Sequence, residues 1–327
     1  IQDFYPKFGY ATAGPEPTVA LPLPEESSDI SPIPSGWDFR PLTPGDMPAV
    51  MRIYHETTKV ATGALRRHEE ADEPDWVKHF ARTSLPATKI GMRAWNKMRD
   101  VFSTDTRDSC RVLVDPAGDI VAYAWEGMLE NWWMFVRRDE FPNSFHLAEA
   151  MALSPMAADV LISACCLWAK EAKPGADRLD LAIPPEGYVA SAAFYEGGSV
   201  FQVNVRRGDF MCRTLNPARL IEQMQPEFTA RIRASSANFC GDIIFRTEMG
   251  DVAMSLTGEG VGANRGQNSA ELMIEVPQDT LARLCLGAFE TRDLLERLPN
   301  PPDRRTCELM EVLFPRRHPH IYPLDRF

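Results

Sequence analysis

Apolar and polar residues alternate with two different periods along the first two thirds of the chain. Residues 37–43 have the short apolar pattern of a strand, and residues 44–58 repeat apolar side chains along one helical face. Thr43 and Asp46 are typical of a helix start, so we expect Thr43 to cap this helix. The apolar positions of the helix fall at i, i+3, i+4 and i+7: Met47, Val50, Met51 and Tyr54.

A hairpin follows, and then a further alternation of helices and strands. Residues 110–127 predict two strands around Asp-Pro-Ala-Gly at 115–118, a sequence typical of a tight turn. The remaining expected elements are a third strand (131–138), a helix (155–170), a strand (178–183), a short helix (190–195) and two paired strands (200–207 and 209–215). This order predicts an α/β domain with a mixed sheet.

The pattern changes near residue 216, where we place a domain boundary. Two short helices, 218–224 and 228–234, lead into a hairpin at 241–256 and a strand at 271–276. Three helices then precede an extended tail that contains three prolines: 278–286, 292–298 and 304–313. The hairpin needs one covered face, because its apolar residues alternate with polar ones: Ile243, Phe245, Val252, Met254 and Leu256. We therefore expect residues 217–327 to form an α+β domain.

Residues 15–35 are rich in Pro, Ser and Glu and have few large apolar side chains, a composition typical of a linker. We expect residues 1–36 to be the end of a preceding domain plus this linker. The sequence begins at Ile1 without an initiating Met, so we also expect the chain to begin inside a longer protein. The N-terminus has neither the basic region nor the apolar region of a signal peptide.

The composition excludes some classes of function. A formal net charge of −11 argues against nucleic acid as a partner, because phosphate binding needs a basic surface. The same charge favours cationic substrates such as amines. No apolar run approaches the about 20 residues of a membrane helix. Seven cysteines without any Cys-x-x-Cys spacing favour reduced, buried thiols in a cytoplasmic protein.

Several stretches resemble bacterial acetyltransferases of the Eis (enhanced intracellular survival) type. The resemblance covers essentially the whole chain, and its quoted segments are FYPKFGYATAG at 4–14, FRPLTPGDMPAVMRIYHE at 39–56, NPARLIEQMQP at 216–226, ELMIEVPQDTLARLCLGAFETRDLL at 271–295 and LFPRRHPHIYPLDRF at 313–327. It implies the end of a first, catalytic GNAT domain at 1–36, a second, degenerate GNAT-like domain at 37–216 and a sterol-carrier-like domain at 217–327. It also implies a cytoplasmic homo-oligomer.

The resemblance further implies N-acetyltransferase activity toward an amine, either a small molecule or a lysine, with acetyl-CoA as co-substrate. Tyr5 would be the general acid that protonates the departing CoA thiolate, since a phenol and a thiol have similar pKa values. The α-carboxylate of Phe327 would be the base. Packing of Tyr5 against a sheet and disorder of the tail remain the alternatives for these two residues.

One departure from the family concerns acetyl-CoA. Family members hold its pyrophosphate on an R/Q-x-x-G-x-G/A loop at a helix start, where backbone amides face the anion. The corresponding segment here, AEAMALSPMAAD at 148–159, has no glycines, and the glycine-rich stretch 257–266 fits better as a hairpin connection. We expect the family's loop to lie upstream of Ile1, so that this chain alone binds acetyl-CoA poorly and is inactive.

Other candidate residues have ordinary structural interpretations. Trp125, Trp132 and Trp133 could line a substrate cavity, but strand core is the better interpretation. The acidic run at 69–75 is expected to be solvated. His318 and His320 lack a third metal ligand, so we expect no metal, and Arg316 and Arg317 are expected to be solvated or paired with acids. Lipid carriage by residues 217–327 and a purely structural module remain alternative functions.

Overall fold

The computed structural model divides the chain into two units by its contacts. The central unit comprises Glu16–Val203 with His320–Phe327, and the C-terminal unit comprises Ile1–Pro15 with Asn204–Pro319. Both units are therefore discontinuous in sequence, and the division falls at residue 203 instead of the expected 216. The structure describes residues 8–14, 16–59, 61–64, 110–126, 143–203, 210–236, 240–257, 260–264 and 272–322.

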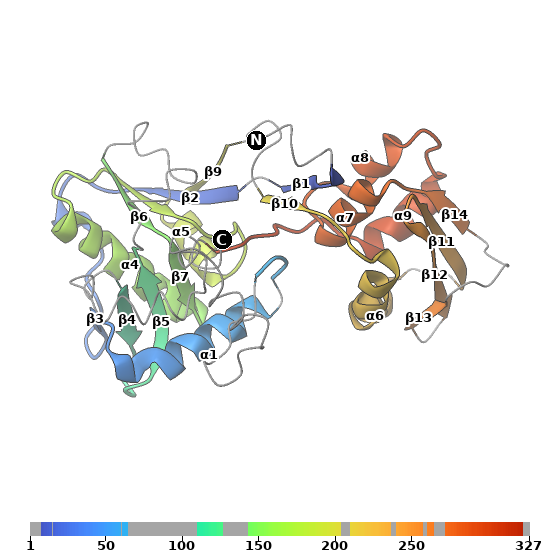
Figure 1. Ribbon diagram of the computed structural model, residues 1–327. Helices are drawn as coiled ribbons and strands as arrows, with labels where there is room; N and C mark the ends of the chain where they lie inside the picture. The colour runs from blue at the N-terminus through green and yellow to red at the C-terminus, as the bar shows by residue number, and fades with distance from the viewer. Residues whose placement is uncertain are drawn as a thin grey trace, which may run out of the picture. The chain divides into compact units, whose positions relative to one another are not determined.

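The central unit contains two four-stranded sheets (Figure 1). One is mixed and has the order β6 (Ser144–Leu147), β8 (Arg178–Leu181), β2 (Glu16–Pro22) and β9 (Ser199–Val203). The other is antiparallel and has the order β3 (Asp38–Pro41), β4 (Cys110–Val114), β5 (Ile120–Trp125) and β7 (Glu149–Ala152). Three helices pack on these strands: α1 (Met47–Thr58), α4 (Pro155–Ala172) and α5 (Tyr188–Tyr195).

The linker expected at 15–35 is wrong, because it contains a central strand. β2 lies between β8 and β9 and hydrogen-bonds to both in antiparallel register. Val19 and Leu21 are buried, and Leu23 follows them in the same core. This alternation of apolar residues is strand-like, but the flanking prolines and glutamates hide it in the composition.

The hairpin expected at 110–127 is confirmed, with β4 and β5 on either side of the turn. The side chain of Asp115 accepts hydrogen bonds from the backbone N–H groups of Ala117 and Asp119, at 3.0 and 2.9 Å. Gly118 takes a φ of +89°, which a side chain rarely tolerates. The expected helix at 155–170 is also confirmed as α4, whereas residues 131–138 lie outside the described residues.

The start of the first helix differs from the expected cap. A 3₁₀ turn, η3 (Pro44–Asp46), precedes α1, and the Asp46 carboxylate accepts hydrogen bonds from Thr43. Thr43 is thus the donor, through both its backbone N–H at 2.7 Å and its hydroxyl at 2.8 Å. Arg40 adds a two-pronged ion pair to the same carboxylate, at 2.7 and 2.9 Å. These bonds hold the pKa of Asp46 down at about 2, the Arg40 hydrogen bond being the largest cause.

The Asp46→Asn variant is expected to lose about 2 kcal/mol of unfolding free energy at pH 7, from the lowered pKa of this carboxyl. The folded pKa lies below the usual value near 3.8, so the stabilisation is complete above that value. It is lost as the pH falls through the folded pKa. The unfolding free energies of wild type and variant, measured with denaturant, should therefore converge between about pH 4 and pH 2. Asp159→Asn is the control, because Asp159 is exposed. A difference in unfolding free energy between wild type and Asp46→Asn that stays constant down to pH 2 would contradict the role of this ion pair.

The C-terminal unit is built on a mixed four-stranded sheet. Its order is β13 (Gly260–Asn264), β12 (Gly250–Thr257), β11 (Gly241–Thr247) and β14 (Leu272–Glu275). A separate two-stranded pair joins β1 (Ala11–Gly14) to β10 (Phe210–Cys212). The described parts of the pair expected at 200–207 and 209–215 do not pair with each other: β9 pairs with β2, and β10 pairs with β1. The stretch 257–266 includes the strand β13 and is not merely a connection.

The covered face of the hairpin is confirmed. Ile243 is opposite Met254, and Phe245 is opposite Val252, in the antiparallel register of β11 and β12. These four side chains and Leu256 are all buried in one hydrophobic cluster. The helices α7 (Gln278–Leu286), α8 (Thr291–Glu296) and α9 (Arg304–Leu313) contribute to the same cluster, as expected for an α+β layer.

A single helix, α6 (Pro217–Ala234), replaces the two helices expected at 218–224 and 228–234. Pro226 lies inside it and removes one backbone hydrogen bond. The helix continues through the proline because one face is packed, with Ile221, Phe228 and Ile232 buried at i, i+7 and i+11. Asn216 caps its start by accepting a hydrogen bond from the backbone of Arg219 at 2.9 Å.

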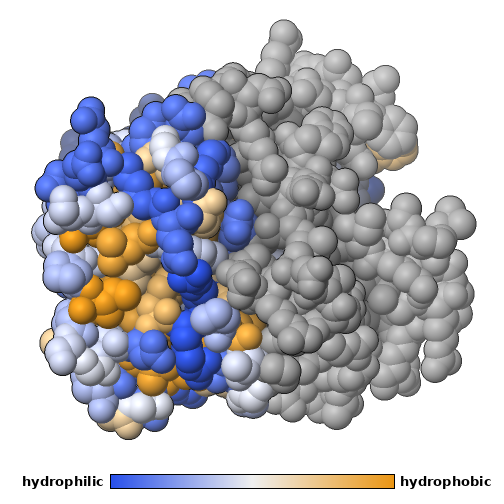
Figure 2. Space-filling view, turned by 90° about the vertical axis from the view of Figure 1, so that its left-hand side faces the viewer, coloured by the Kyte–Doolittle hydropathy of each residue, from blue (hydrophilic) through white to orange (hydrophobic). Residues whose placement is uncertain are grey.

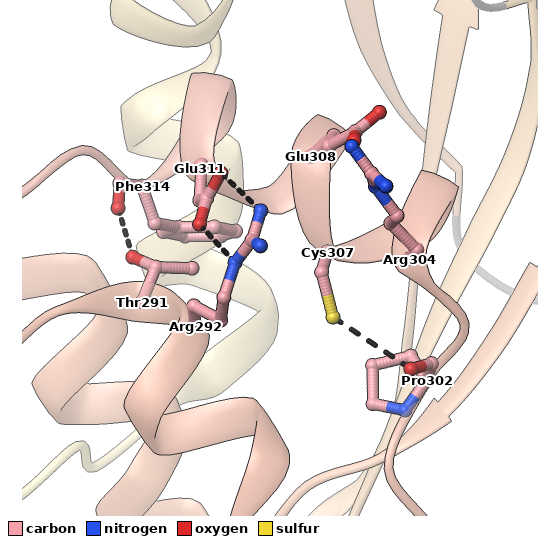
Figure 3. A network of polar contacts seen from close by, with 8 residues as sticks. All are labelled: Thr291, Arg292, Pro302, Arg304, Cys307, Glu308, Glu311 and Phe314. Atoms are coloured by element: carbon pink, nitrogen blue, oxygen red, sulfur yellow. Dashed lines mark hydrogen bonds and ion pairs between the residues drawn. The ribbon is translucent and has the colours of Figure 1, made fainter.

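The last helices are fastened to each other by polar contacts (Figure 3). The hydroxyl of Thr291, at the start of α8, donates to the carbonyl of Phe314, just after α9. Arg292 forms a two-pronged pair with Glu311 across the same two helices, at 2.8 and 3.1 Å. These contacts hold Phe314 in place, and its ring is completely buried.

Candidate functional site

The strand at 144–152 changes partners between the two sheets of the central unit. Its first half, β6, runs parallel to β8, and its second half, β7, runs antiparallel to β5. Ala148 lies at the change: its N–H donates to the carbonyl of Trp125 at 2.8 Å. One residue earlier, the carbonyl of Leu147 accepts from the N–H of Ala182 at 2.9 Å. The two sheets therefore part at Ala148.

A buried acid lies beside the junction. Glu149 is completely buried, and its carboxylate accepts a hydrogen bond from the hydroxyl of Tyr123 on β5. Glu149 is directly opposite Trp125 in the register of β5 and β7. The indole N–H of Trp125 is buried and finds no acceptor among the residues that the structure describes. A carboxylate next to a phenol can hold a cation or exchange a proton, provided that substrate can reach it.

Sequence reasoning missed Glu149, although the sequence contains a signal for it. Glu149 is the only acidic residue in the apolar run 147–158. A charged residue in such a run is rarely fully buried unless it has a partner. The partner here is Tyr123, which lies 26 positions earlier in the sequence.

The first turn of α4 follows the junction, and one of its backbone N–H groups is already bonded to the capping residue. Ser154 accepts a hydrogen bond from the N–H of Ala157 at 3.2 Å, and Pro155 has no N–H to offer. A phosphate at a helix start needs several amides that point outward. The first turn of α4 therefore offers fewer donors than a glycine-rich loop would.

The chain's own tail contacts Ala182, which is bonded to the junction through Leu147. His320 donates its backbone N–H to the carbonyl of Thr62 at 2.9 Å, and its ring Nε2 lies 3.0 Å from the carbonyl of Ala182. Tyr322 packs edge to face on both His320 and Tyr54, with ring centroids 4.7 and 5.9 Å apart. His320 and Tyr322 are both buried. We call Tyr54, Thr62, Gly63 and Ala182 the tail seat.

The two residues predicted to carry the chemistry, Tyr5 and Phe327, lie outside the described residues. Of the aromatic residues near Tyr5, Phe8 is half exposed and Tyr10 is about one third exposed. The acidic run at 69–75, Trp132 and Trp133 also lie outside the described ranges. Their roles remain predictions.

The expectations for Trp125, Arg316 and Arg317 are confirmed. Trp125 is a buried core residue of β5. Arg316 pairs with Glu290 at 2.7 Å, and Arg317 lies 3.7 Å from Glu227. Within the described ranges, no group of three or more His, Cys, Asp and Glu residues is arranged to hold a metal ion. His320 binds backbone carbonyls instead.

None of the seven cysteines forms a disulfide, and four of them are buried. Burial raises the pKa of Cys166 to about 12 and that of Cys285 to about 12. Burial also raises the pKa of Cys110, with the neighbouring Glu149 as the next cause. Thiols with raised pKa values stay protonated and are poor nucleophiles, so these cysteines fit a structural role.

The visible surface on the side of the central unit is mixed in character (Figure 2). Hydrophobic patches on its coloured residues are interrupted by a hydrophilic band. No helix in the described part of the chain has both the length and the hydropathy that a membrane span requires.

No protein-family model matches the sequence. No curated protein matches it either. Solved structures do match: a "probable N-acyltransferase" from Enterococcus faecalis aligns at TM-score 0.59 and 12% identity, over 97% of this chain and 67% of its own. A GCN5-related N-acetyltransferase from Kribbella flavida aligns at TM-score 0.58 and 13% identity, over 100% of this chain and 68% of its own. Eis1 from Mycobacterium abscessus aligns at TM-score 0.47 and 14% identity, over 95% of this chain and 67% of its own.

These likenesses concern the fold, which is the mixed α/β, GNAT-like architecture expected from the sequence. The matched segments run through both units, and the chain spans about two thirds of the length of each of these structures. Structural neighbours of the chain are therefore GCN5-related N-acetyltransferases.

Proposed function

We propose that this chain is part of an N-acetyltransferase that moves the acetyl group of acetyl-CoA to a primary amine. The observation that carries the proposal is the fold likeness over 97–100% of the chain to proteins named as N-acyl- or N-acetyltransferases. Identities of 12 and 13% support the fold alone, so the activity rests on the fold together with the chemistry below.

The proposal assigns acetyl-CoA to a segment that precedes Ile1. The central unit has the GNAT-like sheet, but at the start of α4 Ser154 already accepts from the N–H of Ala157 and Pro155 has no N–H. A CoA pyrophosphate there would find few free amides. The central unit then serves as a scaffold, and a neighbouring domain with a glycine-rich loop supplies the cofactor site.

The chemistry needs a base and an acid. The amine must be neutral to attack the thioester carbonyl, and the CoA thiolate that leaves must gain a proton. We assign the base to the carboxylate of Phe327 and the acid to Tyr5. An acidic protein with a net charge of −11 would attract cationic amines, from polyamines and aminoglycosides to lysine side chains. We further propose a cytoplasmic homo-oligomer, as the Eis resemblance implies.

The experiment compares two proteins, the 327-residue chain and a longer version that includes the coding sequence upstream of Ile1. Each is incubated with acetyl-CoA and, in turn, a polyamine, an aminoglycoside and a lysine peptide, while CoA thiol release is followed. We expect release with at least one amine by the longer protein and background release by the chain alone. Background release by the longer protein with every amine would contradict the proposal, and full activity of the chain alone would contradict the upstream cofactor site.

A further inference from the structure

His320 and Tyr322 are held on the central unit by hydrogen bonds and ring contacts. Two backbone carbonyls from distant parts of the central unit, those of Thr62 and Ala182, bind one residue. Ala182 lies 138 positions away in sequence, directly after β8. A carbonyl oxygen only accepts, so in the contact at 3.0 Å the Nε2–H of His320 is the donor.

Gly63 shows that the tail lies tightly in the seat. Its φ is +92°, and a Cβ built there would lie 2.9 Å from the backbone nitrogen and 3.0 Å from the carbonyl oxygen of His320. Backbone atoms cannot yield as the end of a flexible side chain can. Any larger residue at this position would therefore push the tail backbone away.

Tyr54 forms the apolar wall of the seat. Its ring is completely buried in α1 and meets the ring of Tyr322 at 69°, an edge-to-face arrangement. Tyr322 also meets the His320 ring at 80°, so the two tail residues brace each other. Burial and ring contacts thus act on both His320 and Tyr322, and hydrogen bonds act on His320, in a stretch that itself forms no helix or strand.

We propose that the tail seat positions the end of the chain for catalysis, with His320 and Tyr322 as positioning residues. By fixing residues 320–322 on the central unit, the seat limits where the following residues, and with them Phe327, can go. The ordering is completed before substrate arrives, so the base need not be ordered in each turnover. This inference rests on the proposed function, because the group that is positioned is the proposed base.

The test uses three substitutions and a matched control. His320→Leu removes the donor to Ala182, and His320→Gln restores an N–H at a similar reach. Gly63→Ala places a Cβ against the tail backbone. Gly118→Ala is the control, because Gly118 has nearly the same positive φ, +89°, but nothing within 4 Å of a built Cβ.

The first measurement is amide hydrogen exchange at residues 320–322 in the 327-residue chain. We expect exchange to be at least about tenfold faster in His320→Leu and Gly63→Ala than in wild type, because local opening is then easier. His320→Gln and Gly118→Ala should exchange within about threefold of wild type. Unchanged exchange in both His320→Leu and Gly63→Ala would overturn the seat.

The second measurement is steady-state kinetics of the longer, active protein. The same two variants should lose about tenfold or more in kcat with an unchanged KM for acetyl-CoA, since the seat orders a base and not the cofactor. His320→Gln should rescue most of that loss. Faster exchange with unchanged kcat would overturn the positioning role. An inactive wild-type protein with faster exchange in the variants would instead refute the proposed function, and the positioning role with it.

Discussion

Tyr5→Phe is expected to lower kcat for acetyl transfer by about 10²- to 10⁴-fold, the usual contribution of a general acid. In the proposed mechanism the phenol donates the proton that the CoA thiolate needs as it leaves, and phenylalanine keeps the ring but has no proton to give. The KM for acetyl-CoA should change little, because the lost interaction forms in the transition state. The measurement is the rate of CoA thiol release by the longer, active protein.

Tyr10→Phe is the matched control for that experiment. Tyr10 lies in the same aromatic-rich segment, is about one third exposed, and loses the same hydroxyl in the variant. It should keep kcat within about twofold, because the proposed mechanism gives it no role in proton transfer. Equal losses in the two variants would point to packing of the whole segment, and an unchanged kcat in Tyr5→Phe would remove Tyr5 from the mechanism.

Phe314→Ala is expected to destabilise the C-terminal unit by about 3–5 kcal/mol, the usual cost of truncating a fully buried phenylalanine. The Phe314 ring packs edge to face on Phe228 of α6 at 5.1 Å and on Phe245 of β11 at 5.9 Å. Its loss leaves a cavity between a helix and the sheet and removes two aromatic contacts. This one ring thus joins layers that are far apart in sequence.

The measurement is hydrogen exchange of the β11 and β12 amides, which reports on this unit alone even if the two units unfold separately. Phe194→Ala, a partly exposed ring of α5 in the central unit, should leave those amides unchanged. Exchange of β11 and β12 that is no faster in Phe314→Ala than in wild type would contradict the central place of this ring in the core.

The elements that could be predicted from the sequence are those specified by local patterns. The alternation of Ile243 and Phe245 on β11 with Val252 and Met254 on β12 predicts both the strands and their covered face. The start of α9 at Arg304 follows from the capping residue Asp303, whose side chain accepts from the N–H of Thr306 at 2.8 Å. Each of these signals acts within a few residues or across one turn.

The elements that were predicted wrongly depend on distant partners. β2 is a strand because β8 and β9 flank it, and no pattern near Val19 indicates those neighbours. Pro226 is tolerated inside α6 because buried side chains on one face stabilise the helix beyond the cost of the proline, about 3 kcal/mol. Local propensity was overruled by tertiary packing in both places.

The residues of the candidate site also divide into those predicted from the sequence and those brought together only by the fold. Tyr5 and Phe327 were predicted from a family resemblance, and both stay predictions because they lie outside the described residues. Glu149 and Tyr123 belong to neighbouring strands, and His320 and Ala182 meet across 138 positions. Such contacts follow from the topology of the fold, which single-residue patterns do not contain.

The most direct test of the central claim is to follow an isotopically labelled acetyl group from acetyl-CoA in the presence of the longer protein and an amine. Mass spectrometry of the amine and of the protein then shows where the label goes. We expect the label on the amine nitrogen and an equal amount of CoA thiol released. We expect no label on the cysteines, four of which are buried. Label that stays on acetyl-CoA with every amine tested would contradict the assignment of this chain to an amine acetyltransferase.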